Sequence, residues 1–197
     1  MTLDLHEVAA AGALIFDCDG TLVDTPPLYA RAYVQAATAH GVKMTGDWYL
    51  ARAGLSEHVL MDAMEEMHGR PYDRAALIAS MRAAFMADID ALREIEVVAD
   101  IARAWHGRKP LAVASGGPRR AVETSLGATG LRSLFDVLVT IEDVRAGKPE
   151  PDLFLEAARR IGIAPARCLV FEDSEQGVDA ARRAGMRVID VTRLSAP

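Results

Sequence analysis

Short apolar runs alternate with helical patterns along the C-terminal half of the chain. Strands are expected at residues 110–115, 136–140, 168–171 and 186–191, and helices at residues 97–105, 118–127, 150–161 and 176–184. A similar apolar run at residues 13–17 predicts one more strand of the same sheet. Continuous apolar strands that alternate with helices are typical of a parallel sheet covered on both faces. The pattern therefore predicts an α/β fold.

The segment between the first predicted strand and this alternation has a different pattern. This segment contains no convincing strand. Its apolar residues have helical spacing in three stretches, at residues 28–40, 56–68 and 73–92. Ser56 is typical of a capped helix start. We therefore expect a helical insertion at residues 28–91, within a core formed by residues 1–27 and 92–197.

The composition is that of an ordinary soluble globular protein, with 51% hydrophobic and 25% charged residues among 197. The formal net charge of −6 argues against nucleic acids and anionic membranes as partners. We expect neither a signal peptide nor a membrane span, because no apolar stretch has the required length and flanks. Cys18 and Cys168 lie in apolar runs, which favours reduced packing residues and a cytoplasmic location.

Two aspartates follow the first predicted strand, in the run Asp17-Cys18-Asp19-Gly20-Thr21. Open α/β sheets bind ligands at the carboxyl ends of their strands. Paired carboxylates at such an end suit Mg²⁺ binding and attack on phosphorus. Asp-Gly is also ordinary turn chemistry, so the interpretation depends on the motifs at the other strand ends.

Two further motifs precede predicted helices and could bind an anion. Ser115-Gly116-Gly117 ends a strand before a helix that begins with proline, where backbone N–H groups and the helix N-terminus favour negative charge. Lys148, in Lys148-Pro149-Glu150-Pro151, can direct its ammonium to a strand end and screen the repulsion between carboxylate and phosphate. We expect Ser115, Gly116 and Lys148 to bind a phosphoryl group.

Another predicted strand ends with two more acids, in Phe171-Glu172-Asp173-Ser174. Mg²⁺ usually takes one or two carboxylates together with water and phosphate oxygens. The expected carboxylate ligands are Asp17 and Asp173. Asp19 is expected to contribute its backbone carbonyl, which leaves its side chain for proton transfer. The five histidines show no metal-ligand spacing, and this disfavours zinc.

The chain resembles the haloacid dehalogenase-like hydrolase superfamily over nearly its whole length. The resemblance lies in the order of the motifs: Asp-x-Asp-Gly-Thr, a helical insertion, a serine, Lys-Pro-x-Pro and Glu-Asp. The chain looks like the β-phosphoglucomutase-like branch, which carries a small helical cap. Residues 97–194 look most like small bacterial fructose-1-phosphate phosphatases. The resemblance implies a Rossmann-like core, a Mg²⁺ cofactor and a small phosphorylated metabolite as substrate.

The resemblance also implies a role for each motif. Asp17 would be the nucleophile that forms an aspartyl-phosphate. Asp19 would protonate the leaving alcohol and then activate water. Ser115 and Lys148 would hold the phosphoryl oxygens, and Asp173 would complete the Mg²⁺ site with Glu172 nearby.

In the predicted cap, the resemblance implies two functional segments. Residues 21–25 would form the hinge between core and cap. The run Arg52-Ala53-Gly54-Leu55-Ser56 resembles a loop that faces the substrate, which makes Arg52 a candidate contact to sugar or phosphate.

The function implied is a Mg²⁺-dependent phosphatase of small sugar phosphates such as fructose 1-phosphate. A hexose-phosphate mutase is the alternative, although related mutases carry a hydrophobic residue in place of Thr21 and a histidine in place of Tyr29. A haloacid dehalogenase attacks carbon without a metal, and a second aspartate at position 19 speaks against it. The intact acids and Lys148 disfavour a regulatory protein on the same fold. The sequence does not indicate the oligomeric state.

Overall fold

The computed structural model describes residues 5–55, 57–69 and 71–194. Within these residues five parallel strands form one sheet, in the order β3-β2-β1-β4-β5. Their bounds are β1 Ala13–Phe16, β2 Leu111–Ala114, β3 Val137–Val139, β4 Cys168–Glu172 and β5 Arg187–Asp190. Four strands lie within the stretches where strands are predicted, and β4 extends one residue beyond its predicted stretch, to Glu172. The prediction of an α/β fold with a parallel sheet is confirmed.

The first strand occupies the centre of the sheet. Phe16 of β1 is in register with Val113 of β2 and with Phe171 of β4. All four side chains of β1 are buried, and the ring of Phe16 stacks on that of Phe171 with centroids 4.7 Å apart. Because both faces of this strand are covered, its sequence is an unbroken apolar run without polar alternation.

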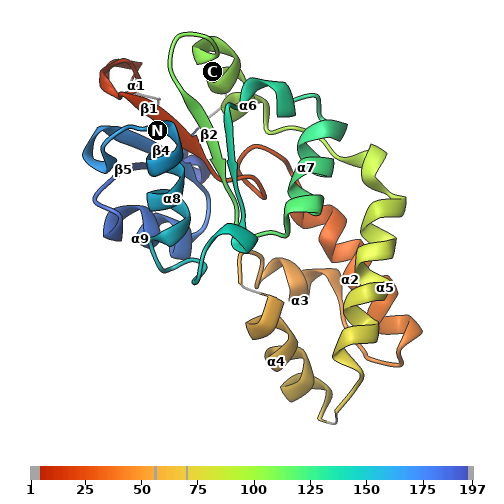
Figure 1. Cartoon of the computed structure of the whole chain (residues 1–197). Coiled ribbons are helices and arrows are strands. Elements are labelled where there is room, and N and C mark those ends of the chain that lie inside the picture. The colour runs from red at the N-terminus through yellow and green to blue at the C-terminus, as the bar shows by residue number, and fades with distance from the viewer. Residues whose placement is uncertain (1–4, 56, 70, 195–197) are drawn as a thin grey trace. The chain divides into compact units, whose positions relative to one another are not determined.

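Helices cover both faces of the sheet (Figure 1). The helices of the core that follow β1 are α6 Glu96–Trp105, α7 Arg119–Ala128, α8 Asp152–Ile161 and α9 Glu175–Arg183. On one face, Leu153 and Phe154 of α8 and Ala180 of α9 belong to the same buried cluster as Ile15 and Val170. Figure 1 shows α7 on the other side of the strands. Strands and helices thus form the repeated βα units that the sequence predicts.

The direction in which strands are added reverses beside β1. The chain runs from β1 to β2 and β3 on one side, and then crosses to β4 and β5 on the other. Open α/β sheets bind ligands at such a switch point, at the carboxyl ends of the strands. Asp17 directly follows β1, while Glu172 ends β4 and Asp173 follows it. The topology therefore brings acids from two distant motifs to the same edge of the sheet.

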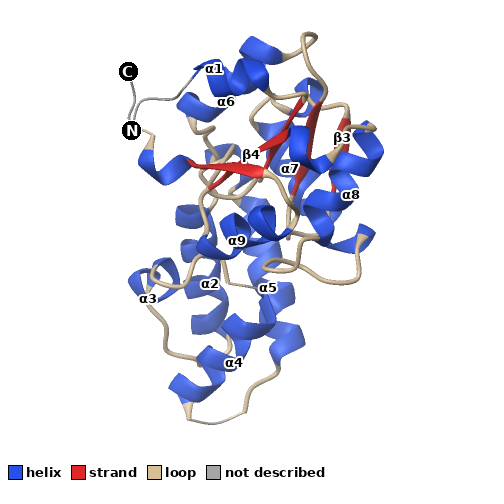
Figure 2. Ribbon diagram, turned by 90° about the vertical axis from the view of Figure 1, so that its left-hand side faces the viewer, coloured by secondary structure: helices blue, strands red, loops and turns tan. Residues whose placement is uncertain are grey.

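Residues 24–92 form a second compact unit, separate from residues 1–23 and 93–197. Its helices are α2 Pro26–Ala39, α3 Gly46–Leu50, α4 Glu57–His68 and α5 Arg74–Ala87, which Figure 2 draws in blue. Aromatic rings build its interior: Tyr29 stacks on Phe85 at 4.3 Å, and Tyr33 stacks on Tyr49 at 5.1 Å. No strand occurs among the described residues of this helical unit.

Some boundaries differ from the predictions. The short helices α1 Leu5–Ala10 and α3 were not predicted, because one or two turns carry too little periodicity to be recognised. The helix predicted for residues 73–92 is shorter, since α5 ends at Ala87 and a separate 3₁₀ turn, Ile89–Ala91, follows. The predicted cap residue Ser56 lies outside the described residues. No helix in the described part of the chain is long and apolar enough to cross a membrane.

An ion-pair network joins the end of β3 to α7 and α8. Asp143 accepts hydrogen bonds from Arg119 of α7 at 2.5 Å and from Arg160 of α8 at 2.8 Å. It also accepts one from the backbone N–H of Thr140 at 2.8 Å. Burial raises the pKa of Asp143, but these donors outweigh it and lower the pKa to about 2. The charged form of Asp143 thus stabilises the core beside the loop that carries Lys148.

We expect Asp143→Asn to reduce the free energy of unfolding by about 2 kcal/mol at neutral pH. A lowered pKa means that the folded protein binds this proton more weakly than the unfolded chain. The stabilisation is therefore present above pH 4 and is lost as the pH falls from about 4 to about 2. Urea unfolding across this range should show a smaller pH dependence in the variant.

Glu150→Gln is the matched control, because Glu150 pairs with Arg183 while both side chains are more than two-fifths exposed. Exposed pairs of this kind contribute about 0–1 kcal/mol. An equal loss of unfolding free energy in Asp143→Asn and Glu150→Gln would contradict the claim that charged Asp143 stabilises the core.

Candidate active site

Asp17 lies buried at the end of the central strand. Its backbone N–H donates to the carbonyl of Phe171 at 3.0 Å, which ties it to β4, and its side chain is 7% exposed. Burial raises the pKa of Asp17 well above its ordinary value; the Lys148 ammonium opposes this effect and the neighbouring acids add to it. A carboxylate held in one position beside a cation is suited to nucleophilic attack.

The ammonium of Lys148 joins the acids of the two central strands. Lys148 Nζ donates to Asp17 Oδ1 and, at 2.7 Å, to Glu172 Oε1. Burial lowers the pKa of Lys148, but the two carboxylates outweigh it and raise the pKa, so the ammonium stays charged. A permanent cation therefore lies at the strand ends, as the position before Pro149 led us to expect.

Asp173 is held by the loop that follows Asp19. Thr21 Oγ1 donates to Asp173 Oδ1 at 2.8 Å. Gly20 has φ of 83°, and a Cβ at this position would lie 2.3 Å from Asp173 Oδ2. Only glycine combines this backbone conformation with so close an approach. The Gly-Thr pair of the first motif thus positions the acid of the last one.

Three acids could hold a metal ion together. Ligand oxygens of Asp17, Glu172 and Asp173 all lie within 4.8 Å of one another. When all three acids are ionised, their charge exceeds that of the single Lys148 ammonium by two in a buried site, and a divalent cation would compensate this excess. The donors are hard oxygen atoms, and this donor set suits Mg²⁺.

Glu172 is the residue of this group that sequence reasoning did not place among the ligands. A signal for it exists in the strand register: Phe16 is paired with Phe171, so the next residues, Asp17 and Glu172, are neighbours across the two strands. The pairing of the two strands is not visible in the motifs themselves.

The side chain of Asp19 does not belong to this group of three, and it points to a different partner. Its Oδ2 accepts a hydrogen bond from Ser115 Oγ at 3.4 Å, and Ser115 Oγ accepts one from the N–H of Gly117 at 3.1 Å. The predicted metal contact of Asp19 through its backbone carbonyl remains a prediction. The side chain of Asp19 lies beside Ser115, outside the group of three acids that could bind a cation.

The other predicted contacts lie in different settings. Gly116 is exposed, and nothing within 4 Å would meet a Cβ added at this position. Arg52 belongs to the helical unit, where its guanidinium stacks on the ring of Trp48 at 4.3 Å and donates to the Trp48 carbonyl at 3.1 Å. Its predicted contact to the substrate stays a prediction.

The sequence profile of the haloacid dehalogenase-like hydrolases matches residues 11–185. The chain belongs to this family of hydrolases. The match spans both the strand that delivers Asp17 and the strand that ends in Glu172. The resemblance seen in the motifs is thereby confirmed, and the hydrolase carries its candidate site where the family motifs meet.

Three known proteins illustrate the relationship. The hydrolase is 36% identical over 182 residues to the fructose-1-phosphate phosphatase YqaB of Escherichia coli K12, covering 92% of this chain and 96% of that protein. It is similar to the structure of a candidate β-phosphoglucomutase from Thermotoga maritima, with a TM-score of 0.70, 30% identity and coverage of 89% and 83%. A CbbY variant from Rhodobacter sphaeroides, in complex with xylulose 1,5-bisphosphate, gives a TM-score of 0.74, 27% identity and coverage of 90% and 84%.

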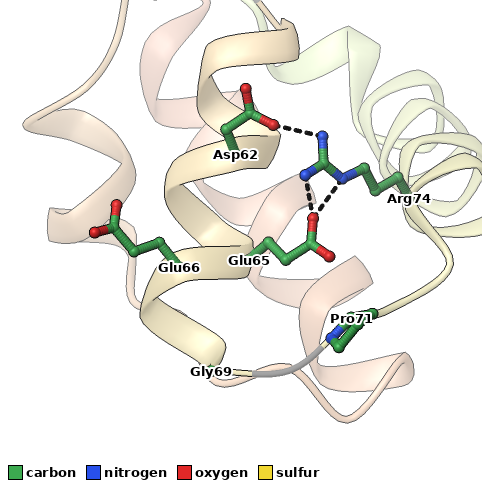
Figure 3. Close-up of a pocket in the computed structure, with 6 residues that line it drawn as sticks. All are labelled: Asp62, Glu65, Glu66, Gly69, Pro71 and Arg74. Atoms are coloured by element: carbon green, nitrogen blue, oxygen red, sulfur yellow. Dashed lines mark hydrogen bonds and ion pairs between the residues drawn. The ribbon is translucent and has the colours of Figure 1, made fainter.

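A shallow pocket of about 400 Å³ lies in the helical unit of the hydrolase, lined by Asp62, Glu65, Glu66, Gly69, Pro71 and Arg74. Figure 3 shows the guanidinium of Arg74 between Asp62 and Glu65, with hydrogen bonds to both, that to Asp62 at 2.6 Å. Among the described residues that line the pocket, Arg74 is the one cation, and it pairs with Asp62 and Glu65. The pocket holds none of the acids that follow the strands, so we do not assign the reaction to it.

The stability of the metal-free hydrolase should fall as the pH rises from about 4 to about 7. Burial and the Glu172 carboxylate raise the pKa of Asp173 to about 7, against the hydrogen bond from Thr21. Between about pH 4 and pH 7, Asp173 keeps its proton in the folded protein but has lost it in the unfolded chain. The free energy of unfolding therefore decreases as the pH rises through this range. The raised pKa of Asp17 acts in the same direction.

Urea unfolding in a chelator at several pH values measures this slope. Asp173→Asn should flatten it, and saturating Mg²⁺ should stabilise the wild type more at higher pH, because a metal ion binds the deprotonated carboxylate. A slope that is equal in the wild type and in Asp173→Asn would contradict the assignment.

Proposed function

We propose that this hydrolase cleaves the phosphate monoesters of small sugars, with fructose 1-phosphate as the representative substrate, through an aspartyl-phosphate on Asp17. The observation that carries the proposal is the position of Asp17: a buried carboxylate at the end of β1, in contact with a permanent ammonium, with a second aspartate two residues later. This arrangement supplies a nucleophile, a countercharge and a proton donor for one reacting phosphate.

In the first step, a carboxylate oxygen of Asp17 attacks the phosphorus atom, and the bond from phosphorus to the sugar oxygen breaks. Asp19 in its protonated form gives its proton to the departing alkoxide. Lys148 and the donors around Ser115 stabilise the charge that develops on the phosphoryl oxygens. The products of this step are the free sugar and the phosphorylated Asp17.

In the second step, water attacks the phosphorus of the aspartyl-phosphate. Asp19, now deprotonated, accepts a proton from that water and thereby returns to its starting state. The bond from phosphorus to the Asp17 oxygen breaks, and inorganic phosphate leaves. One residue acts as acid and then as base, so its side chain must stay outside the group of acids that could bind a cation.

Asp17 and Asp173 would hold Mg²⁺, with Glu172 in the same group and the Asp19 carbonyl as the further ligand expected from the sequence. When bound, Mg²⁺ would neutralise negative charge on carboxylate and phosphate, which otherwise repel each other. The uncompensated charge of the three acids supports this assignment. Removal of Mg²⁺ by a chelator should abolish activity, and its return should restore it.

The names of relatives support a sugar phosphate as substrate. YqaB is a fructose-1-phosphate phosphatase, and the CbbY variant holds xylulose 1,5-bisphosphate, so both names concern a ketose phosphorylated at position 1. The candidate β-phosphoglucomutase from Thermotoga maritima favours the mutase as the second function. In this chain, the position of the mutase histidine holds Tyr29, whose ring stacks on Phe85 in the helical unit.

The deciding experiment measures two products from each ester. We expect release of inorganic phosphate from fructose 1-phosphate, and little conversion of β-glucose 1-phosphate into glucose 6-phosphate with or without a bisphosphate primer. Isomerisation that depends on the primer and outpaces phosphate release would establish the mutase instead. If neither ester were turned over while other phosphate esters were hydrolysed, the phosphatase activity would stand and only the proposed sugar would be wrong.

A further inference from the structure

Lys148 and three donors from the residues just before α9 surround the Glu172 carboxylate. Its Oε1 accepts from Lys148 and, at 3.0 Å, from Ser174 Oγ. Its Oε2 accepts from the backbone N–H groups of Asp173 at 2.6 Å and of Ser174 at 3.3 Å. A carboxylate has about four acceptor sites, so these four donors leave Glu172 one stable position.

Ser174 is also the N-cap of α9. Its Oγ accepts from the N–H of Gly177 at 3.0 Å while its own O–H donates to Glu172. Because the cap hydrogen bond occupies a lone pair of the hydroxyl on the helix side, the hydroxyl proton is directed to the carboxylate. One side chain thus begins the helix and orients the acid that holds Lys148.

Gly177 occupies the third position of α9, where many helices carry a glutamate whose side chain returns to the N–H of the cap residue. Here Glu172, from the end of β4, accepts that N–H instead. A Cβ on Gly177 would lie 1.4 Å from Glu172 Oε1 and 2.1 Å from its Cδ. The absence of a side chain at position 177 is therefore what makes room for the carboxylate.

We propose that Ser174 and Gly177 are positioning residues of the phosphoryl transfer: the first turn of α9 holds Glu172 so that it keeps the Lys148 ammonium on Asp17. The proposal rests on the proposed function, in which Lys148 stabilises charge on the phosphate. The helix N-terminus adds to the effect, because its N–H groups favour a negative charge at this place.

The test compares two helical glycines. Gly177→Ala must displace Glu172, whereas Gly127→Ala in α7 adds a methyl group where nothing lies within 4 Å. We expect Gly177→Ala to lower kcat about tenfold or more, as for a disturbed hydrogen bond to a charged group, with KM for the ester changed by less than about threefold. Gly127→Ala should keep wild-type kcat. Equal kcat values in the two variants would overturn the proposal.

A second pair separates positioning from the stability of a helix end. Ser174→Ala should lower kcat about as much as Gly177→Ala, and Ser174→Thr, which keeps the hydroxyl, should restore most of it. Asp73→Ala removes the cap of α5, whose Asp73 Oδ1 accepts from the Ala76 N–H at 2.9 Å, and should lower the melting temperature without changing kcat. A Ser174→Thr variant as slow as Ser174→Ala would count against the proposal.

The melting temperature with and without Mg²⁺ provides a readout that does not depend on turnover. We expect the Mg²⁺-induced rise to shrink in Gly177→Ala and to remain in Gly127→Ala, because a displaced Glu172 loses the hydrogen bond that it accepts from Asp173, an expected ligand of the ion. If the wild type released no phosphate from any ester, the proposed function would fail, while this comparison would still decide the role of Gly177. A Mg²⁺-induced rise in melting temperature that is the same in Gly177→Ala as in the wild type would overturn the positioning role of Gly177.

Discussion

Asp17→Asn should lower phosphate release to the background rate, a loss on the order of 10⁴-fold or more, because the nucleophile of a covalent mechanism disappears. The amide has nearly the shape of the carboxylate, and the raised pKa of Asp17 shows that its buried charge is unfavourable in the metal-free protein. The variant should therefore fold and melt at the wild-type temperature or above it. Phosphate release and thermal unfolding measure the two effects.

Asp179→Asn is the matched control, since Asp179 is exposed on α9. It should keep wild-type turnover. Mass spectrometry of a rapidly quenched reaction should also find a phosphoryl group on a wild-type peptide that contains Asp17. Turnover of Asp17→Asn at the wild-type rate would exclude the covalent mechanism.

Asp19→Asn should lower the turnover of sugar phosphates by about 10²–10⁴-fold, the usual contribution of proton transfer by a positioned side chain. Both steps need a proton transfer by Asp19. In the first step this need depends on the leaving group, whereas in the second step it does not. A nitrophenyl phosphate releases a stable anion that requires no proton, so formation of the aspartyl-phosphate should be nearly unimpaired, whereas its hydrolysis remains slow.

Stopped-flow measurement with the nitrophenyl ester tests this difference. Asp19→Asn should release one equivalent of nitrophenol in a fast burst and then turn over slowly. Ser115→Ala should be milder, because it removes one donor near Asp19 and leaves the acid in place. Sugar phosphate turnover by Asp19→Asn at the wild-type rate would show that another group transfers the proton.

The sequence by itself determined the class of fold and the order of the motifs. The strands β1, β2 and β4 are buried on both faces, so their sequences are continuous apolar runs that local pattern alone identifies. The acids and Lys148 follow such runs or precede a proline-started helix. The family resemblance followed from that order, and the sequence profile confirmed it.

Only the tertiary structure decided which side chains meet. Glu172 joins Asp17 because of the strand register, and the side chain of Asp19 lies with Ser115 instead. Gly177, which looks like an ordinary weak point in a helix, makes room for Glu172. Arg119 and Arg160 meet at Asp143 across two helices and a strand end. The contact of Ser115 with Asp19 joins residues 96 positions apart, and that of Arg119 with Asp143 joins residues 24 positions apart. No local pattern encodes them, because their distances are set by the packing of whole elements.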